Sequence, residues 1–105
     1  MNKIKIAIAG GTGYTGGELL RLLLNHPYAE VVSVLSTTSA GTRVDSIHRD
    51  LLGDTDLVCT SSIEEGESPD LIFLCLGHGL SREFLSTNNI PQGCKIIDLG
   101  NDFRV

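Results

Sequence analysis

The feature that most constrains the fold is a glycine-rich turn between two apolar runs near the start of the chain. The run over residues 4–9, IKIAIA, is rich in β-branched isoleucine and predicts a strand, and closely spaced leucines from residue 19 predict a helix. Between them lie two overlapping patterns, G-x-x-G-x-x-G from Gly10 and G-x-G-x-x-G from Gly11. Either pattern predicts the first strand-to-helix turn of a dinucleotide-binding fold, where backbone amides and a helix N-terminus bind a pyrophosphate. A tight turn without a ligand is the alternative.

The rest of the chain alternates in the same way between apolar runs and segments of helical spacing. Strands are expected at residues 3–9, 30–36, 56–60, 70–76 and 94–99, and helices at 14–25, 44–52 and 80–88. This alternation predicts an α/β fold, a Rossmann-type doubly wound parallel sheet. Five strands are fewer than a full dinucleotide domain has, so we expect a partial sheet.

The loop after the second strand predicts which dinucleotide binds. An NAD site would carry an acidic residue at the end of this strand to hold the ribose 2′-hydroxyl, and the sequence has none there. The segment 36–43, STTSAGTR, instead offers four hydroxyls and then Arg43, which are groups that donate hydrogen bonds to a 2′-phosphate. We therefore predict NADP as the cofactor, with an ordinary polar loop as the alternative.

The candidate cofactor-binding residues come from three places at the predicted carboxyl edge of the sheet. These places are the glycine turn, the hydroxyl-rich loop, and the end of the strand at 70–76, where ligands bind in open parallel sheets. For His78 we favour packing near the cofactor over an acid–base role. The residues are Gly10, Thr12, Gly13, Tyr14, Thr15, Gly16, Ser36, Thr37, Thr38, Ser39, Leu76, Gly77 and His78.

Composition argues against several other classes of function. The net charge is −5 and Lys and Arg do not cluster, which argues against nucleic-acid binding. No apolar run approaches the roughly 18 residues that a membrane-spanning helix needs, and no signal-peptide layout opens the chain. The three cysteines form no C-x-x-C, so we expect small buried thiols in strands and no metal site. Together these features predict a reduced, cytoplasmic protein.

Four stretches resemble one known family. GGTGYTGGEL, STTSAGTR, LIFLCLGHGLS and IIDLGNDFRV follow one another as in the N-terminal part of the N-acetyl-gamma-glutamyl-phosphate reductases, relatives of aspartate-semialdehyde dehydrogenase. The resemblance covers residues 3–105. It implies that residues 1–105 are the NADP-binding domain of a two-domain enzyme of arginine biosynthesis. That enzyme reduces N-acetyl-glutamyl 5-phosphate to N-acetyl-glutamate 5-semialdehyde, and we expect it to be a homo-oligomer at full length.

The resemblance also implies that the chemistry takes place on residues beyond this sequence. The family's cysteine nucleophile follows an N-P-G sequence that does not occur here, so neither Cys94 nor any other residue of the chain is assigned a catalytic role. The acyl-phosphate substrate would bind through the second domain, and we expect the chain alone to be inactive. The sequence departs from the family at Gly77 and at Gly100. It also departs at Thr37, a position where the family often carries a basic residue.

Three alternatives stay open from the sequence. The first is the cofactor domain of an aspartate-semialdehyde dehydrogenase. The second is a non-catalytic NADP-binding sensor, although the chain lacks the Tyr-x-x-x-Lys pair that such proteins usually carry. The third is a scaffold whose glycine turn holds no ligand.

Overall fold

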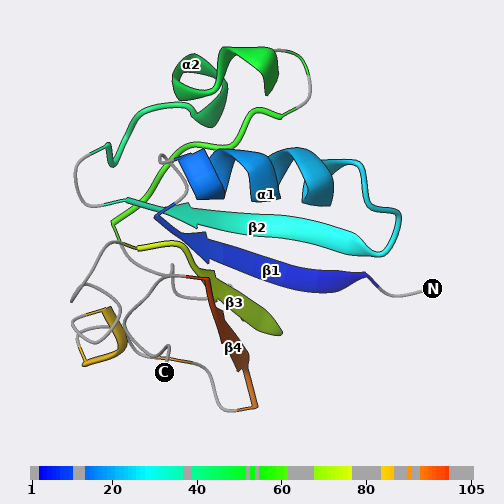
Figure 1. Ribbon diagram of the computed structural model, residues 1–105, viewed down its shortest axis with the longest axis vertical. Helices are drawn as coiled ribbons and strands as arrows, with labels where there is room; N and C mark the ends of the chain where they lie inside the picture. Colours follow the sequence, from blue (N-terminus) through cyan, green and yellow to red (C-terminus); the bar gives the residue numbers. More distant parts are fainter. Residues whose placement is uncertain are drawn as a thin grey trace.

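The centre of the molecule is a sheet of four parallel strands (Figure 1). The computed structural model describes residues 3–10, 14–36, 39–51, 53, 55–61, 68–76, 84–86, 90 and 93–99. The strands are β1 (Ile4–Ala9), β2 (Ala29–Leu35), β3 (Leu71–Leu74) and β4 (Lys95–Asp98), in the spatial order β2-β1-β3-β4. From β1 the chain passes to β2 on one side and then crosses to β3 on the other side. The direction of winding therefore reverses between β1 and β3.

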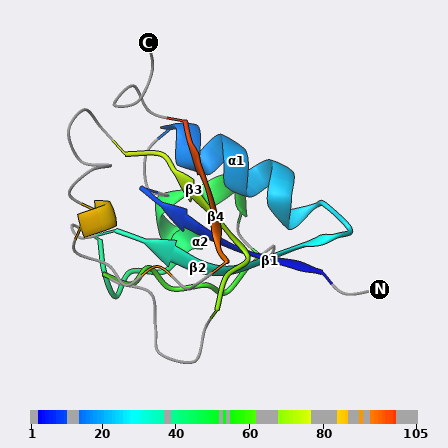
Figure 2. The same cartoon turned by 90° about the horizontal axis from the view of Figure 1, so that it is seen from below.

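Helices cover the sheet on the side of β1 and β2. Helix α1 (Tyr14–Leu24) joins these two strands, and α2 (Val44–Ile47) with the 3₁₀ helix η1 (Arg49–Leu51) lies beyond α1 (Figures 1 and 2). Residues 84–86 form a helical turn that lies apart from α1 in both views. Helix α1 ends before Pro27, because the residue preceding a proline is disfavoured in helical conformation.

The core has two parts because successive side chains of a strand point to opposite faces of the sheet. On the α1 face, Ile6 and Ile8 pack in one cluster with Leu20. On the other face, Ala7 and Ala9 pack in a second cluster, against which the segment at 84–86 also packs. Both faces of β1 are thus covered, which is why its sequence is almost continuously apolar.

The predicted α/β fold class is confirmed, but one predicted strand is wrong. Residues 56–60 form only isolated bridges, because they run along the loop after β2 and reach the strand itself only at its end: Val58 bridges to Arg43 of the loop, and Thr60 to Leu35, the last residue of β2. Within the described residues the sheet therefore has four strands and not five.

The predicted helices are also modified. The helix expected at 44–52 is divided at His48, whose φ of −108° and ψ of 86° are not helical. The result is the short α2 followed by η1. Of the helix expected at 80–88, residues 84–86 are described and are helical, and Phe84 and Leu85 pack against the core.

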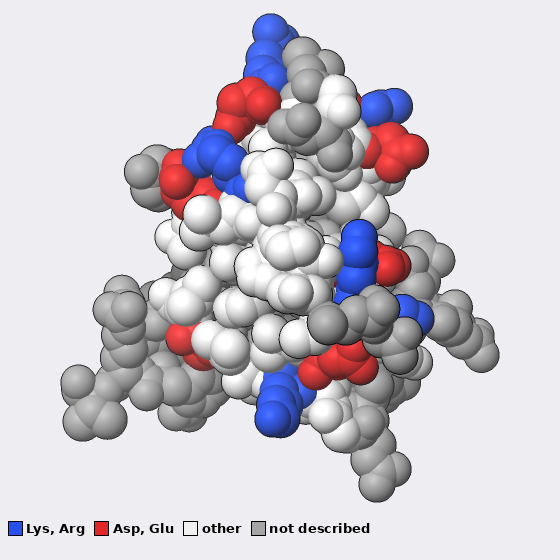
Figure 3. Space-filling view, turned by 90° about the vertical axis from the view of Figure 1, so that its right-hand side faces the viewer, with Lys and Arg blue, Asp and Glu red and all other residues white. Residues whose placement is uncertain are grey.

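Charges of both signs lie side by side on the surface. On the face shown in Figure 3, Lys and Arg side chains neighbour Asp and Glu side chains around an uncharged central area. None of the helices in the described part of the chain is both long enough and apolar enough to cross a bilayer.

Candidate dinucleotide-binding site

Three strand ends meet at one edge of the sheet, where β1, β2 and β3 all finish. The amide of Gly10, just after β1, donates a hydrogen bond to the Leu35 carbonyl of β2 at 2.9 Å. On the other side, the Cys75 amide donates to the Ala9 carbonyl at 2.8 Å. Because the winding reverses between β1 and β3, this edge is the position where open α/β sheets bind their ligands.

Gly10 has a structural reason to be glycine that is independent of any ligand. Its φ is +81°, and an added Cβ would lie 2.5 Å from the Cys75 carbonyl oxygen and 3.0 Å from Leu76 Cδ2. The turn after β1 therefore packs directly on the backbone that follows β3. Sequence reasoning attributed this glycine to the approach of a pyrophosphate, and the structure adds contact with the neighbouring strand end.

The N-terminus of α1 follows this turn and offers a favourable environment for an anion. The helix begins at Tyr14 and has no acidic residue in its first turn, so its positive dipole end is not offset by its own side chains. Thr15 is exposed and Gly16 is buried. A buried third glycine is what close packing of the helix on the sheet requires in a dinucleotide-binding turn.

The loop after β2 is held in place by backbone contacts. Ser36 is buried, and its Oγ accepts a hydrogen bond from the Ser39 amide at 3.1 Å, which closes a turn. The Ser36 amide donates to the Thr60 carbonyl at 2.8 Å, and Gly41 donates to Cys59 at 2.8 Å. The Ser36 hydroxyl thus shapes the loop, and a contact with a 2′-phosphate stays a prediction.

Arg43 is paired with a carboxylate next to the site. Its Nε and one terminal nitrogen donate to the two carboxylate oxygens of Asp45 at 3.1 and 2.8 Å. The hydrogen bond from Arg43 lowers the pKa of Asp45, a buried residue, and the same pairing raises the pKa of Arg43, with a smaller effect of nearby Asp56. These contacts do not support the expectation that Arg43 donates to a 2′-phosphate, because the guanidinium already neutralises a buried carboxylate.

None of the three cysteines lies within a strand, contrary to prediction: Cys59 is in the bridged segment 56–60, Cys75 follows β3 and Cys94 precedes β4. Burial, helped by the charge of Asp98, raises the pKa of Cys75 to about 11. Burial likewise raises the pKa of Cys59 and Cys94, and all three are free. Thiols with raised pKa values stay protonated at neutral pH and are weak nucleophiles. Over the described residues, no three His, Cys, Asp or Glu side chains gather as a metal site.

Sequence reasoning missed a contact between Gly17 and His48. An ideal Cβ on Gly17 would lie 2.6 Å from His48 Cε1, so the imidazole rests on the first turn of α1. The signal was present, because a second glycine inside a helix costs about 1 kcal/mol relative to alanine and the dinucleotide-binding pattern does not require it.

The structure describes part of the predicted site and brings that part together. Gly10, the first turn of α1, Ser36, Ser39 and Leu76 all follow the carboxyl ends of β1, β2 or β3. The remaining candidates lie outside the described residues: Thr12, Gly13, Thr37, Thr38, Gly77 and His78.

Comparison with known proteins gives consistent matches. The family described as "Semialdehyde dehydrogenase, NAD binding domain" matches residues 5–105. N-acetyl-gamma-glutamyl-phosphate reductases of Parabacteroides distasonis and Christiangramia forsetii are 47% and 49% identical over 97% of the chain. The chain spans 31% of the length of each of these curated relatives.

A solved structure has a similar fold. A crystal structure of aspartate semialdehyde dehydrogenase with NADP from Candida albicans superimposes with a TM-score of 0.67 over 85% of this chain and 30% of that one. The two sequences are 20% identical, so the likeness concerns the fold alone.

Proposed function

The chain belongs to the family of semialdehyde dehydrogenase NAD-binding domains, and from this premise we propose that residues 1–105 are the NADP-binding domain of an N-acetyl-gamma-glutamyl-phosphate reductase. The observation that carries the proposal is the 47–49% identity to proteins of that name over 97% of the chain. The four motifs that run from the glycine turn to the IIDLGNDFRV ending support the same assignment.

The described residues fit a bound dinucleotide. The N-terminus of α1, which has no acidic residue in its first turn, would hold the pyrophosphate together with the glycine turn that precedes it. The loop with Ser36 and Ser39 would lie beside the adenosine ribose, where the absence of an acidic residue favours a 2′-phosphate. When bound, NADPH supplies the hydride, and this chain's part is to bind and orient the cofactor.

Other parts of the proposal concern the longer enzyme. A second domain would bind the acyl phosphate and provide the cysteine and histidine that do the chemistry, so the chain alone would be inactive. We also propose a cytoplasmic enzyme that forms homo-oligomers at full length. The free thiols at Cys59, Cys75 and Cys94 support a reducing compartment.

Titration with NADPH and NADH tests cofactor binding by this chain. We expect enhanced nicotinamide fluorescence with NADPH and weaker binding of NADH, because the sequence carries no acidic residue at the end of β2. Tighter binding of NADH would refute the NADP assignment, and binding of neither would refute the cofactor site.

An activity assay tests the substrate. A longer protein that includes the second domain should reduce N-acetyl-glutamyl 5-phosphate and not aspartyl phosphate. The reverse preference would favour the aspartate-semialdehyde dehydrogenase alternative. Activity in the isolated 105-residue chain would show that the catalytic residues lie within it.

A further inference from the structure

We propose that His48 is a positioning residue of the cofactor site, which holds the first turn of α1 at a fixed distance from residues 39–43 of the loop after β2. The inference rests on the proposed function, because this turn and this loop are the pyrophosphate side and the ribose-phosphate side of the NADP site. His48 lies outside both sides and touches neither part of the cofactor in this proposal.

The first contact is between the imidazole of His48 and Gly17. An ideal Cβ on Gly17 would lie 2.6 Å from Cε1, 2.8 Å from Nδ1 and 3.3 Å from Nε2 of His48, so the ring occupies the space of a side chain. Gly17 belongs to the first turn of α1, whose N-terminus faces the pyrophosphate in the proposed function. The position of this ring therefore limits how closely the N-terminal end of α1 approaches the segment that carries His48.

The backbone of His48 is anchored to the core. Its amide donates a hydrogen bond to the Val44 carbonyl at 2.9 Å, and its carbonyl accepts one from the Leu51 amide at 2.9 Å. Val44 and Leu51 are 1% and 2% exposed and belong to the same core cluster as Leu20 of α1. The imidazole thus points toward α1 from a backbone that is anchored to the core.

The same segment continues directly from the loop after β2. The Val44 amide at the start of α2 donates to the Leu57 carbonyl at 2.9 Å, and the Cys59 amide donates to Thr42 at 2.8 Å. The loop and the start of α2 are therefore both held by backbone hydrogen bonds to residues 57–60. A shift at His48 would change the spacing between residues 39–43 of this loop and the first turn of α1.

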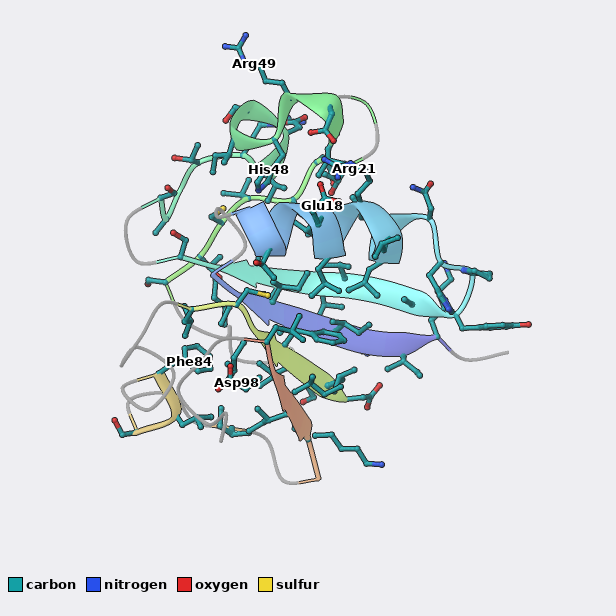
Figure 4. All side chains as sticks on the ribbon, in the orientation of Figure 1. Glu18, Arg21, His48, Arg49, Phe84 and Asp98 are labelled. Atoms are coloured by element: carbon teal, nitrogen blue, oxygen red, sulfur yellow. The ribbon has the colours of Figure 1, made fainter. Side chains whose placement is uncertain are left out.

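An ion pair provides a second, more exposed link between α1 and η1. Arg21 Nε donates to Asp50 at 2.7 Å, and both side chains are more than two-fifths exposed. Figure 4 shows His48 and Arg21 in the space between α1 and the α2–η1 segment, whereas Arg49 points away from the molecule. Because exposed ion pairs contribute little, we assign the positioning role to His48.

The test compares one ligand that spans both sides of the site with one that engages a single side. We expect His48→Ala to weaken NADPH binding about tenfold. Without the imidazole, the spacing between α1 and the loop after β2 is no longer fixed and must become ordered when NADPH binds. Binding of adenosine 2′-monophosphate, which engages the loop side alone, should weaken less than about threefold. His26→Ala, an exposed histidine after the far end of α1, is the matched control and should leave both affinities unchanged.

His48→Gln, which keeps a polar side chain of similar length, is measured in parallel. If the alanine variant does not fold, the affinities of His48→Gln for the two ligands are compared instead. Unchanged NADPH affinity, or equal losses for the two ligands, would overturn the inference while leaving the proposed function intact. Unfolding of both variants would also overturn it, because His48 would then be a requirement of the fold. Absence of NADPH binding by the unsubstituted chain would overturn the proposed function and this inference together.

Discussion

The close approach of the ends of β1 and β3 at Gly10 allows a quantitative prediction of the stability lost on substitution. In Gly10→Ala, the new methyl group would lie 2.5 Å from the Cys75 carbonyl oxygen and 2.9 Å from its carbon. Backbone atoms cannot rotate away, so the strand ends must move, at a cost of about 1–3 kcal/mol for overpacking. The φ of +81° adds about 1 kcal/mol for any residue with a Cβ. We expect a total loss of about 2–4 kcal/mol in the free energy of unfolding.

Gly93→Ala separates these two costs. Gly93 has a φ of +85° and no atom within 4 Å of its ideal Cβ, so it should lose only the backbone part, about 1 kcal/mol. It precedes β4 and therefore lies at the edge of the sheet opposite the proposed site. Urea denaturation followed by circular dichroism measures both variants. Equal losses in the two variants would refute the argument that Gly10 packs on the backbone after β3.

Three further predictions concern the core, the acid limb of stability and the thiols. Leu20→Ala, at a fully buried position, should lower the free energy of unfolding measured in urea by about 3 kcal/mol. Leu22→Ala, at 70% exposure, should change it by less than about 0.5 kcal/mol. Similar losses in the two variants would contradict the assignment of Leu20 to the buried face of α1. Because Arg43 lowers the pKa of Asp45 in the folded state, this carboxylate stabilises the fold above its unfolded pKa of about 4. That stabilisation is lost as the pH falls further, so Asp45→Asn should flatten the drop in urea midpoint between about pH 5 and pH 2. An equally steep drop would argue against the ion pair. Cys75, with a pKa of about 11, should react slowly with iodoacetamide at pH 7 in the folded chain and faster in urea; rapid labelling of the folded chain would contradict its protonated, partly buried state.

The local parts of the fold could be predicted because each rests on a short-range pattern. Apolar periodicity identified β1 and α1 to within a residue, since burial of one strand or one helix face requires that spacing. Residues 56–60 were predicted as a strand because their composition suits one, but pairing depends on which backbone lies alongside. In the structure that neighbour is the loop after β2, and only Thr60 reaches the last residue of β2.

The candidate site was likewise only partly predictable. The sequence pattern predicted that the ends of β1, β2 and β3, with Gly10 and Ser36 after them, lie at one edge, because parallel strands place their carboxyl ends together. Tertiary structure alone decided that Gly10 rests on the Cys75 backbone and that His48 rests on Gly17. These contacts join residues through the directions of side chains in packed layers, and such directions follow from the assembled fold and not from the order of residues along the chain.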